Sequence, residues 1–146
     1  MSTRSFLPQG FARPAAVAAL GSFAAFAVPA IASAQSGFAW ACAPTASSYI
    51  ASSVCAPYVY NSRSGAVRIS RSSVGNYTVD FVGLGGRTTV GGIVHVTPYG
   101  GDNQVCKVVS WGSGGTDFVV NVRCFMPNTL ANADSLFDIT VDWQGE

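Results

Sequence analysis

Short segments in which apolar and polar residues alternate recur from residue 67 to residue 143, and this pattern constrains the fold most strongly. Tyr77, Val79 and Phe81 alternate with Thr78 and Asp80, which places the apolar side chains on one face of an extended strand. The same alternation returns at Val67 and Ile69, at Ile93 and His95 against Val94 and Val96, at Val105, Val109 and Trp111, at Phe118, Val120 and Val122, and at Phe137, Ile139, Val141 and Trp143. A period of two residues is typical of half-buried strands, and no useful length of the chain has a helical period.

Glycine-rich segments separate these predicted strands. They occur at residues 83–86, 91–92, 100–103 and 112–115, where glycine accepts the positive φ angles that a chain reversal needs. Their spacing predicts an all-β fold, an antiparallel β-sandwich of about seven to eight strands with jelly-roll or immunoglobulin-like topology. The stretch 43–54 is expected to be the least regular part of it.

The N-terminal segment has the pattern of a cleaved secretory signal peptide. Arg4 and Arg13 precede an uncharged run that ends in Ala32-Ser33-Ala34. A basic head, an apolar middle and small residues before the cut are typical of such signals. We therefore predict a signal peptide over residues 1–34 and a single β-sandwich domain over residues 35–146.

A retained membrane anchor is the alternative interpretation of the same apolar run. Gly21 and Pro29 interrupt that run, and Cys42, the nearest cysteine, follows it too late to form a lipidation motif. The protein is therefore expected to be secreted, either extracellular or periplasmic, with no membrane attachment after cleavage.

Four cysteines, Cys42, Cys55, Cys106 and Cys124, become disulfide candidates in an exported protein. They allow three pairings, which the sequence cannot decide between. If the segments on either side of the glycine turn 112–115 form a hairpin, Cys106 lies opposite Cys124, about 4.5 to 5.5 Å away at Cα. This arrangement favours Cys106 with Cys124 and leaves Cys42 to pair with Cys55, while the other two pairings stay open.

The charge balance argues against a nucleic-acid partner. Charged residues make up only 10% of the chain, where about 25% is usual. Without the two arginines of the predicted signal, six basic residues stand against seven acidic ones, so no bulk charge attracts phosphate backbones or anionic membranes. The only basic cluster, Arg63, Arg68 and Arg71, is typical of a solvated strand and loop.

One set of residues suggests a hydrolase. His95, Asp102 and Ser113 follow one another in the order of a trypsin-like triad. In that family an acid precedes the serine, where this chain has Gly112, and the fold needs two barrels. Because His95 also lies within a predicted strand, we expect a non-catalytic protein, with a small extracellular hydrolase or an enzyme inhibitor as the alternative.

Metal or cofactor chemistry is not expected either. His95 is the only histidine, and no acid or cysteine stands at a recognisable ligand spacing from it. Asp134, Asp138 and Asp142 form no calcium-binding loop motif. On a strand, Asp138 and Asp142 share one face with Thr140, which predicts a solvated outer face.

Aromatic residues are frequent after residue 34 and suggest a binding role. Trp40, Trp111 and Trp143 are expected to fill the core, whereas Tyr58 and Tyr60 are not assigned. Tyr99 lies next to a glycine turn, where a core role is hard. Aromatic rings with a polar tip suit protein or carbohydrate partners. Candidate surface contacts are Tyr99, Asp102 and Asn103.

Several short motifs resemble a group of bacterial secreted β domains without assigned function, some of which carry the unit in tandem. The resemblance covers about residues 60–143. Its motifs are Gly75-Asn76-Tyr77-Thr78-Val79-Asp80-Phe81-Val82-Gly83-Leu84-Gly85, Val94-His95-Val96-Thr97-Pro98-Tyr99-Gly100, Cys106-Lys107-Val108-Val109-Ser110-Trp111-Gly112, Val120-Asn121-Val122-Arg123-Cys124-Phe125 and Asp134-Ser135-Leu136-Phe137. It implies that Cys106 pairs with Cys124, and it offers no catalytic residue.

Overall fold

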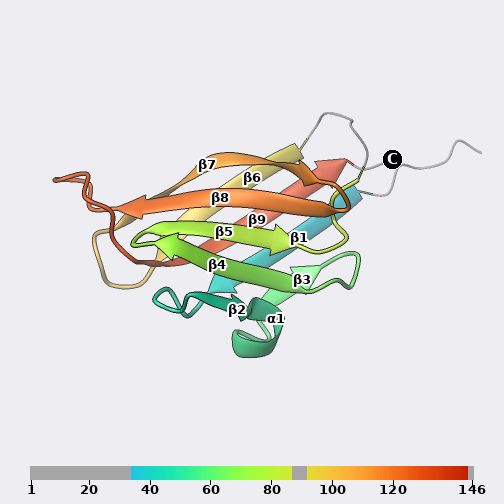
Figure 1. The fold of residues 1–146 in the computed structure, drawn as a ribbon, viewed down its shortest axis with the longest axis horizontal. Helices are drawn as coiled ribbons and strands as arrows, with labels where there is room; N and C mark the ends of the chain where they lie inside the picture. The colour runs from blue at the N-terminus through green and yellow to red at the C-terminus, as the bar shows by residue number, and fades with distance from the viewer. Residues whose placement is uncertain (1–33, 87–91, 145–146) are drawn as a thin grey trace, which may run out of the picture. The chain divides into compact units, whose positions relative to one another are not determined.

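The computed structural model of the protein describes residues 34–86 and 92–144. The predicted signal peptide, apart from Ala34, lies outside these residues. Two antiparallel sheets face each other, and the five-stranded sheet lies in front of the four-stranded sheet in Figure 1. The strands are β1 (Ala34–Ala41), β2 (Ser48–Ile50), β3 (Val59–Asn61), β4 (Val67–Ser73), β5 (Asn76–Phe81), β6 (Gly92–Tyr99), β7 (Val105–Gly114), β8 (Asp117–Phe125) and β9 (Leu136–Gln144), and the one described helix is α1 (Ala51–Val54).

The predicted all-β sandwich is confirmed, with a larger number of strands than expected. Nine strands form in the described residues instead of seven or eight. The sequence pattern missed β2 and β3 because a strand of three residues is too short to show an alternation. Both lie in or just after the stretch that was expected to be irregular.

The strand order is β3-β1-β9-β6 in one sheet and β2-β4-β5-β8-β7 in the other. The first and last described strands are therefore neighbours in the middle of the four-stranded sheet. They pair over eight positions, from Ala34 opposite Gln144 to Ala41 opposite Phe137. β6 pairs along the other side of β9.

The core lies between the two sheets and is filled by the predicted alternating residues. In β5 and β8, Tyr77, Val79, Phe81, Phe118 and Val120 are buried. The apolar residues of β4 and β9 are buried in the same way: Val67, Ile69, Phe137, Ile139, Val141 and Trp143. Each fully buried large side chain contributes about 1.5 to 3 kcal/mol to folding, so these four strands fix the sandwich.

β7 departs from the predicted alternation. The pairing with β8 shifts between Val108 and Ser110, which leaves Val109 as the extra residue of a β-bulge. Val105 and Val109 are 38% and 58% exposed. After the bulge, Trp111 lies opposite the buried Val120, and its ring contacts Phe118 and Trp143, although the residue is 41% exposed. The prediction that one apolar face of this strand is buried was therefore wrong for Val105 and Val109, whereas Trp111 faces the core without being fully buried.

Both cysteine pairs favoured by the sequence are disulfide-bonded. Cys106 and Cys124 lie opposite each other in β7 and β8, with their Cα atoms 4.0 Å apart. Cys42 and Cys55 link the end of β1 to the turn after α1, across 5.8 Å at Cα. One bridge therefore fastens neighbouring strands of the five-stranded sheet, and the other fastens a connection to the four-stranded sheet.

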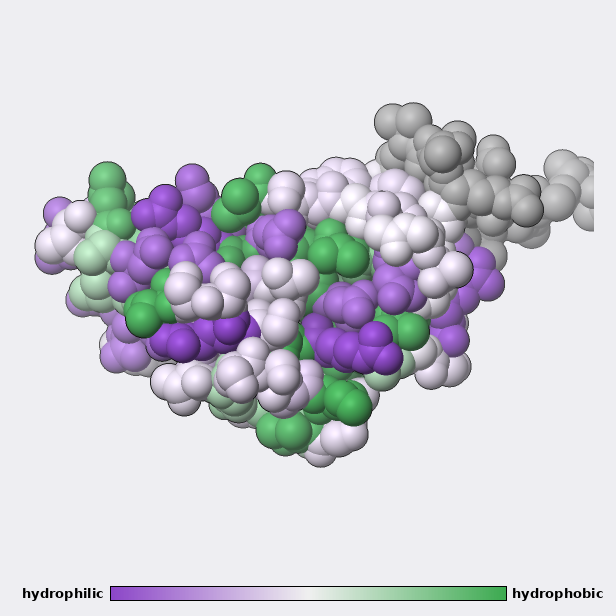
Figure 2. All heavy atoms as spheres, viewed as in Figure 1, coloured by the Kyte–Doolittle hydropathy of each residue, from purple (hydrophilic) through white to green (hydrophobic). Residues whose placement is uncertain are grey.

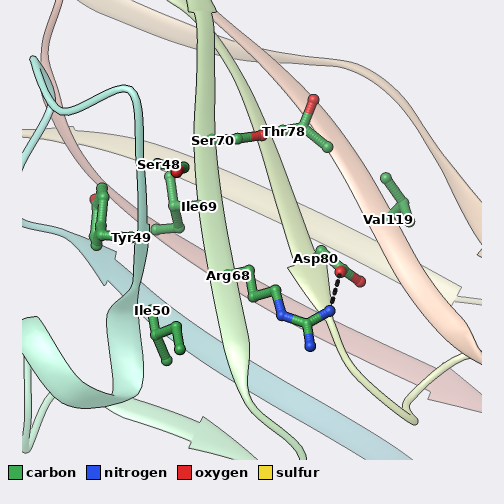
Figure 3. Close-up of a pocket in the computed structure, with 9 residues that line it drawn as sticks. All are labelled: Ser48, Tyr49, Ile50, Arg68, Ile69, Ser70, Thr78, Asp80 and Val119. Carbon is green, nitrogen blue, oxygen red and sulfur yellow. Dashed lines mark hydrogen bonds and ion pairs between the residues drawn. The ribbon is translucent and has the colours of Figure 1, made fainter.

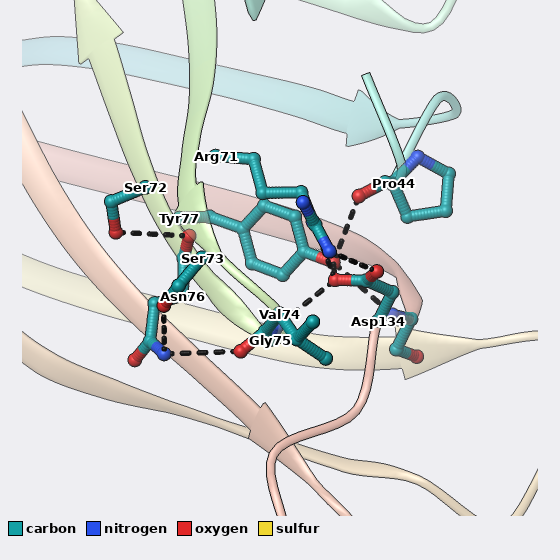
Figure 4. Close-up of polar contacts among 10 residues, drawn as sticks. Pro44, Arg71, Ser72, Ser73, Val74, Gly75, Asn76, Tyr77 and Asp134 are labelled. Carbon is teal, nitrogen blue, oxygen red and sulfur yellow. Dashed lines mark hydrogen bonds and ion pairs between the residues drawn. The ribbon is translucent and has the colours of Figure 1, made fainter. Parts of the chain in front are cut away.

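A polar cluster joins β4 and β5 to the segment before β9 (Figure 4). The Arg71 guanidinium donates two hydrogen bonds to the Asp134 carboxylate, at 2.8 and 2.7 Å. The Gly75 amide and the Tyr77 hydroxyl donate to the same carboxylate at 2.8 and 2.9 Å. The prediction of a solvated basic cluster was therefore wrong for Arg71, whose side chain is 22% exposed, whereas that of Arg68 is 56% exposed.

Candidate functional site

Strand β1 reverses the usual distribution of side-chain size. Three of its four buried positions hold small residues, Gly37, Ala39 and Ala41, while Phe38 and Trp40 occupy the opposite face. A Cβ atom on Gly37 would lie only 2.8 Å from the Phe81 ring of the facing sheet. The core beside β1 is thus filled from the other sheet, and the large aromatic side chains of β1 point away from it.

Five aromatic rings gather on this outer side of the four-stranded sheet. Phe38 and Tyr60 stack on neighbouring strands with ring centroids 5.7 Å apart. The Trp40 ring makes edge contacts with Tyr58 at 5.6 Å and with Tyr99 at 5.9 Å. We call this surface, defined by Phe38, Trp40, Tyr58, Tyr60 and Tyr99, the aromatic face; it belongs to the sheet that lies behind in Figure 1.

Polar side chains lie between these rings because β9 and β6 continue the same face. Across the sheet, Trp40 lies opposite Asp138, which in turn lies opposite Thr97. One pair further along, Phe38 lies opposite Thr140, which lies opposite His95. The exposed side of β9 matches the prediction of a polar outer face, and it brings carboxylate and hydroxyl oxygens to within a strand spacing of the aromatic rings.

Two hollows lie on the aromatic face. The first, of about 270 Å³, is lined by Trp40, Tyr58, Tyr99 and Asp138. The second, of about 290 Å³, is lined by both aromatic and polar side chains. Its lining side chains include Ser36, Phe38, Tyr60, Thr140 and Asp142. Mixed hollows of this kind, mostly apolar with a few placed polar groups, are typical of small-ligand sites.

Asp138 is the polar group of the first hollow. Partial burial raises the pKa of its carboxyl above the ordinary value. Among the described residues this carboxylate has no hydrogen-bond donor and no cationic partner. Its negative charge is therefore available to a ligand.

The candidate surface contacts are all exposed, but only one belongs to the aromatic face. Tyr99 ends β6 and is 57% exposed beside Trp40. Asp102 and Asn103 lie in the connection between β6 and β7 and line neither hollow.

The expected burial of the tryptophans is confirmed only for Trp143, which is 6% exposed. Trp40 is half-buried on the aromatic face, and Trp111 borders the core beside Phe118 and Trp143 but is 41% exposed. Phe38 and the role of Asp138 were missed from the sequence. The signal that could have found them is the inverted pattern of β1, with glycine and alanine where a buried strand face normally carries large residues.

The possible triad does not assemble. His95 is on β6 and Ser113 is near the far end of β7, whereas Asp102 precedes the start of β7. At about 3.3 Å per strand residue, the stretch of β7 from Val105 to Ser113 spans roughly 26 Å, so Asp102 and Ser113 lie toward opposite ends of this strand. The Ser113 hydroxyl donates instead to the Gly115 carbonyl at 2.9 Å, and His95 lines neither hollow.

In residues 34–86 and 92–144 no group of three or more potential metal ligands comes together. Within these ranges no helix has the length and apolar character required to cross a bilayer.

The five-stranded sheet carries a different kind of hollow. Figure 3 shows a groove of about 370 Å³ over β2, β4 and β5, in which Arg68 reaches toward Asp80 at 3.5 Å. The paired charges offset each other there, and no aromatic cluster borders the groove. Figure 2 shows hydrophilic and hydrophobic residues intermixed on this side of the molecule. The aromatic face is therefore the stronger candidate site.

Comparisons with protein-family models, with curated proteins and with solved structures found no match for this chain. The resemblance to secreted bacterial β domains stays a prediction. Function must accordingly be argued from the aromatic face itself.

Proposed function

We propose that the protein is an exported, disulfide-stabilised, non-catalytic module that binds carbohydrate through the aromatic face. The observation that carries this proposal is the gathering of five aromatic rings on one side of one sheet, with carboxylate and hydroxyl oxygens between them. A sugar presents a C–H face that packs on an aromatic ring and hydroxyl groups that need hydrogen-bond partners. Both requirements are met on this surface.

The second hollow suits a sugar ring best. Phe38 and Tyr60, which are 43% and 47% exposed, supply its aromatic side. Ser36, Thr140 and Asp142 supply hydroxyl and carboxylate oxygens in the same hollow. Because these side chains project from three neighbouring strands, β3, β1 and β9, the backbone holds them in place before any ligand arrives.

Export is supported by two independent features. The predicted signal peptide directs the chain out of the cytoplasm. The two disulfides bond all four cysteines, and such bonds persist in oxidising compartments. A carbohydrate partner fits this location, where glycans of envelopes and media are found.

Affinity electrophoresis of the purified protein through gels that contain soluble polysaccharides tests the proposal. We expect retardation in at least one polysaccharide, and we expect Phe38→Ala and Tyr60→Ala to weaken binding about tenfold, since removing a central aromatic anchor costs about 1 to 2 kcal/mol. Val109→Ala, at an exposed apolar position on the other sheet, serves as the control and should leave binding unchanged. Equal retardation of all variants, or none for the unmodified protein over a broad glycan panel, would contradict the proposal.

A further inference from the structure

We propose that the first hollow, lined by Trp40, Tyr58, Tyr99 and Asp138, binds a quaternary ammonium group of the choline type. This site is separate from the hollow assigned to a sugar ring and does not depend on that assignment. Three aromatic rings and one carboxylate are the components of an aromatic cage, in which ring faces and a negative charge surround an organic cation.

The three rings have the orientations that such a cage needs. The Tyr58 ring stands at 87° to the Trp40 ring, and the Tyr99 ring stands at 76° to it. Both tyrosines are thus nearly perpendicular walls beside the indole, at centroid distances of 5.6 and 5.9 Å. Rings that stand at right angles around a hollow of about 270 Å³ enclose a compact group from several sides, whereas a flat row of rings would bind an extended ligand.

The charge of the surroundings is complementary to a cation. Asp138 lies directly opposite Trp40 in the pairing of β1 with β9, and Asp142 is four residues further along the same exposed side of β9. On the described outer side of the four-stranded sheet there is no lysine or arginine. The electron-rich ring faces add to the negative potential of the Asp138 carboxylate, which is the acidic group that lines the hollow.

The composition of the hollow favours a methylated cation over a primary amine. A primary ammonium is strongly hydrated and presents three hydrogen-bond donors. The hollow offers one carboxylate and mainly aromatic surface, so a primary ammonium would lose water without replacing it. A trimethylammonium group has no donors to satisfy, and its methyl groups pack against rings.

The backbone positions two of the cage members together. The Trp40 amide donates to the Tyr58 carbonyl at 3.1 Å, and the Tyr58 amide donates to the Cys55 carbonyl at 3.1 Å. Cys55 is in turn bonded to Cys42, two residues after Trp40. This closed path holds the Tyr58 ring beside the indole and lowers the ordering cost of binding.

Titration of the purified protein with choline chloride, followed by calorimetry and tryptophan fluorescence, tests the proposal. We expect saturable binding with a Kd in the millimolar range or below. Ethanolamine should bind at least tenfold more weakly, and 3,3-dimethylbutanol, the neutral analogue of the same shape, should not bind measurably. Asp138→Asn and Tyr58→Ala should each weaken choline binding about tenfold, as the loss of one charge or one ring of a cage predicts.

Asp142→Asn is the matched control, because it removes a carboxylate from the same side of β9 outside the cage. This variant should change the Kd for choline by less than twofold, and so should Phe38→Ala. Circular dichroism and thermal unfolding verify that each variant is folded. Equal binding of choline and the neutral analogue, or equal loss in Asp138→Asn and Asp142→Asn, would overturn the proposal.

The same variants separate this site from the carbohydrate site. Loss of glycan binding in Phe38→Ala with choline binding retained supports both, whereas choline binding without any glycan binding removes the carbohydrate proposal alone. Sedimentation with phosphatidylcholine vesicles then identifies the carrier of the cation. If the protein co-sediments with the vesicles, and both free choline and the Asp138→Asn substitution abolish this, the cation is carried by a lipid headgroup. If the protein binds choline but does not co-sediment, the cation belongs to a soluble molecule or to a polymer.

Discussion

At the scale of single residues, Asp134 has the most interactions of any described carboxylate. It accepts hydrogen bonds from Arg71, Gly75 and Tyr77, which belong to two strands and the turn between them. The turn cannot move aside easily, because the Gly75 carbonyl accepts from the Cys124 amide at 2.7 Å. Asp134 therefore anchors the β4–β5 turn to the chain that leads into β9.

The stability of the protein should depend on the ionisation of Asp134. The hydrogen bonds from Arg71, followed by those from the Gly75 amide and Tyr77, lower the pKa of this carboxyl from 3.8 to about 2. Because the folded-state pKa is depressed, the stabilisation is complete above about pH 4 and is lost as the pH falls toward 2. We expect the free energy of unfolding, measured by urea denaturation, to decrease over this range.

Asp134→Asn keeps the shape of the side chain and removes the titrating group. The variant should unfold at a lower Tm at pH 7, by on the order of 5 °C for a loss near 1 kcal/mol in a domain of this size. Its urea midpoint should also vary less between pH 4 and pH 2 than that of the unmodified protein. Parallel pH dependence in the two proteins would assign the acid sensitivity to other carboxyl groups.

At the scale of structural elements, the two disulfides have different roles. Cys106–Cys124 fastens two strands that are already paired, whereas Cys42–Cys55 fastens the turn that presents Tyr58. Both close loops of similar length, with sequence separations of 18 and 13, so each is worth about 3 kcal/mol by the chain-entropy model. The two bridges should therefore contribute similarly to stability, but only Cys42–Cys55 should contribute to the shape of the first hollow.

A pair of double variants separates these roles. We expect Cys42→Ala/Cys55→Ala and Cys106→Ala/Cys124→Ala to lower the free energy of unfolding by similar amounts, about 3 kcal/mol each. Only the first should weaken choline binding, by about fivefold or more, because Tyr58 loses its attachment beside Trp40. Titration at a temperature at which both variants are folded measures this difference, and equal binding by both would argue against a role of the Cys42–Cys55 bridge in the site.

Elements with a regular alternation were predictable, and those set by long-range pairing were not. The buried faces of β5 and β8 and the Cys106–Cys124 pair follow from the spacing of residues within one or two segments. The bulge at Val109 has no local signal, because valine fits a regular strand equally well. The cage combines residues from positions 40, 58, 99 and 138, and their meeting depends on the strand order β3-β1-β9-β6, which no local pattern encodes.

At the scale of the whole molecule, the free edges of the sheets are the regions most open to other chains. β7 is an edge strand and carries three exposed apolar residues, Val105, Val109 and Trp111. An apolar edge of this length is a template for strand addition. The bulge at Val109 and the exposed Lys107 are features that natural sheets use to prevent it.

Replacing that lysine should expose the edge to self-association. In Lys107→Val an apolar row would run from residue 105 to residue 109, and we expect an increase in molar mass with concentration relative to the unmodified protein. Size-exclusion chromatography with light scattering measures it. Lys107→Arg, which keeps the charge, should behave like the unmodified protein, and an unchanged mass for both variants would show that the bulge alone protects the edge.

The pairing of β1 with β9 determines when the four-stranded sheet can form during synthesis. A ribosome releases β1 about a hundred residues before β9, so the four-stranded sheet cannot close until β9 has been made. Pairing at such separation is slow to form, so the closing of this sheet is a late step of folding.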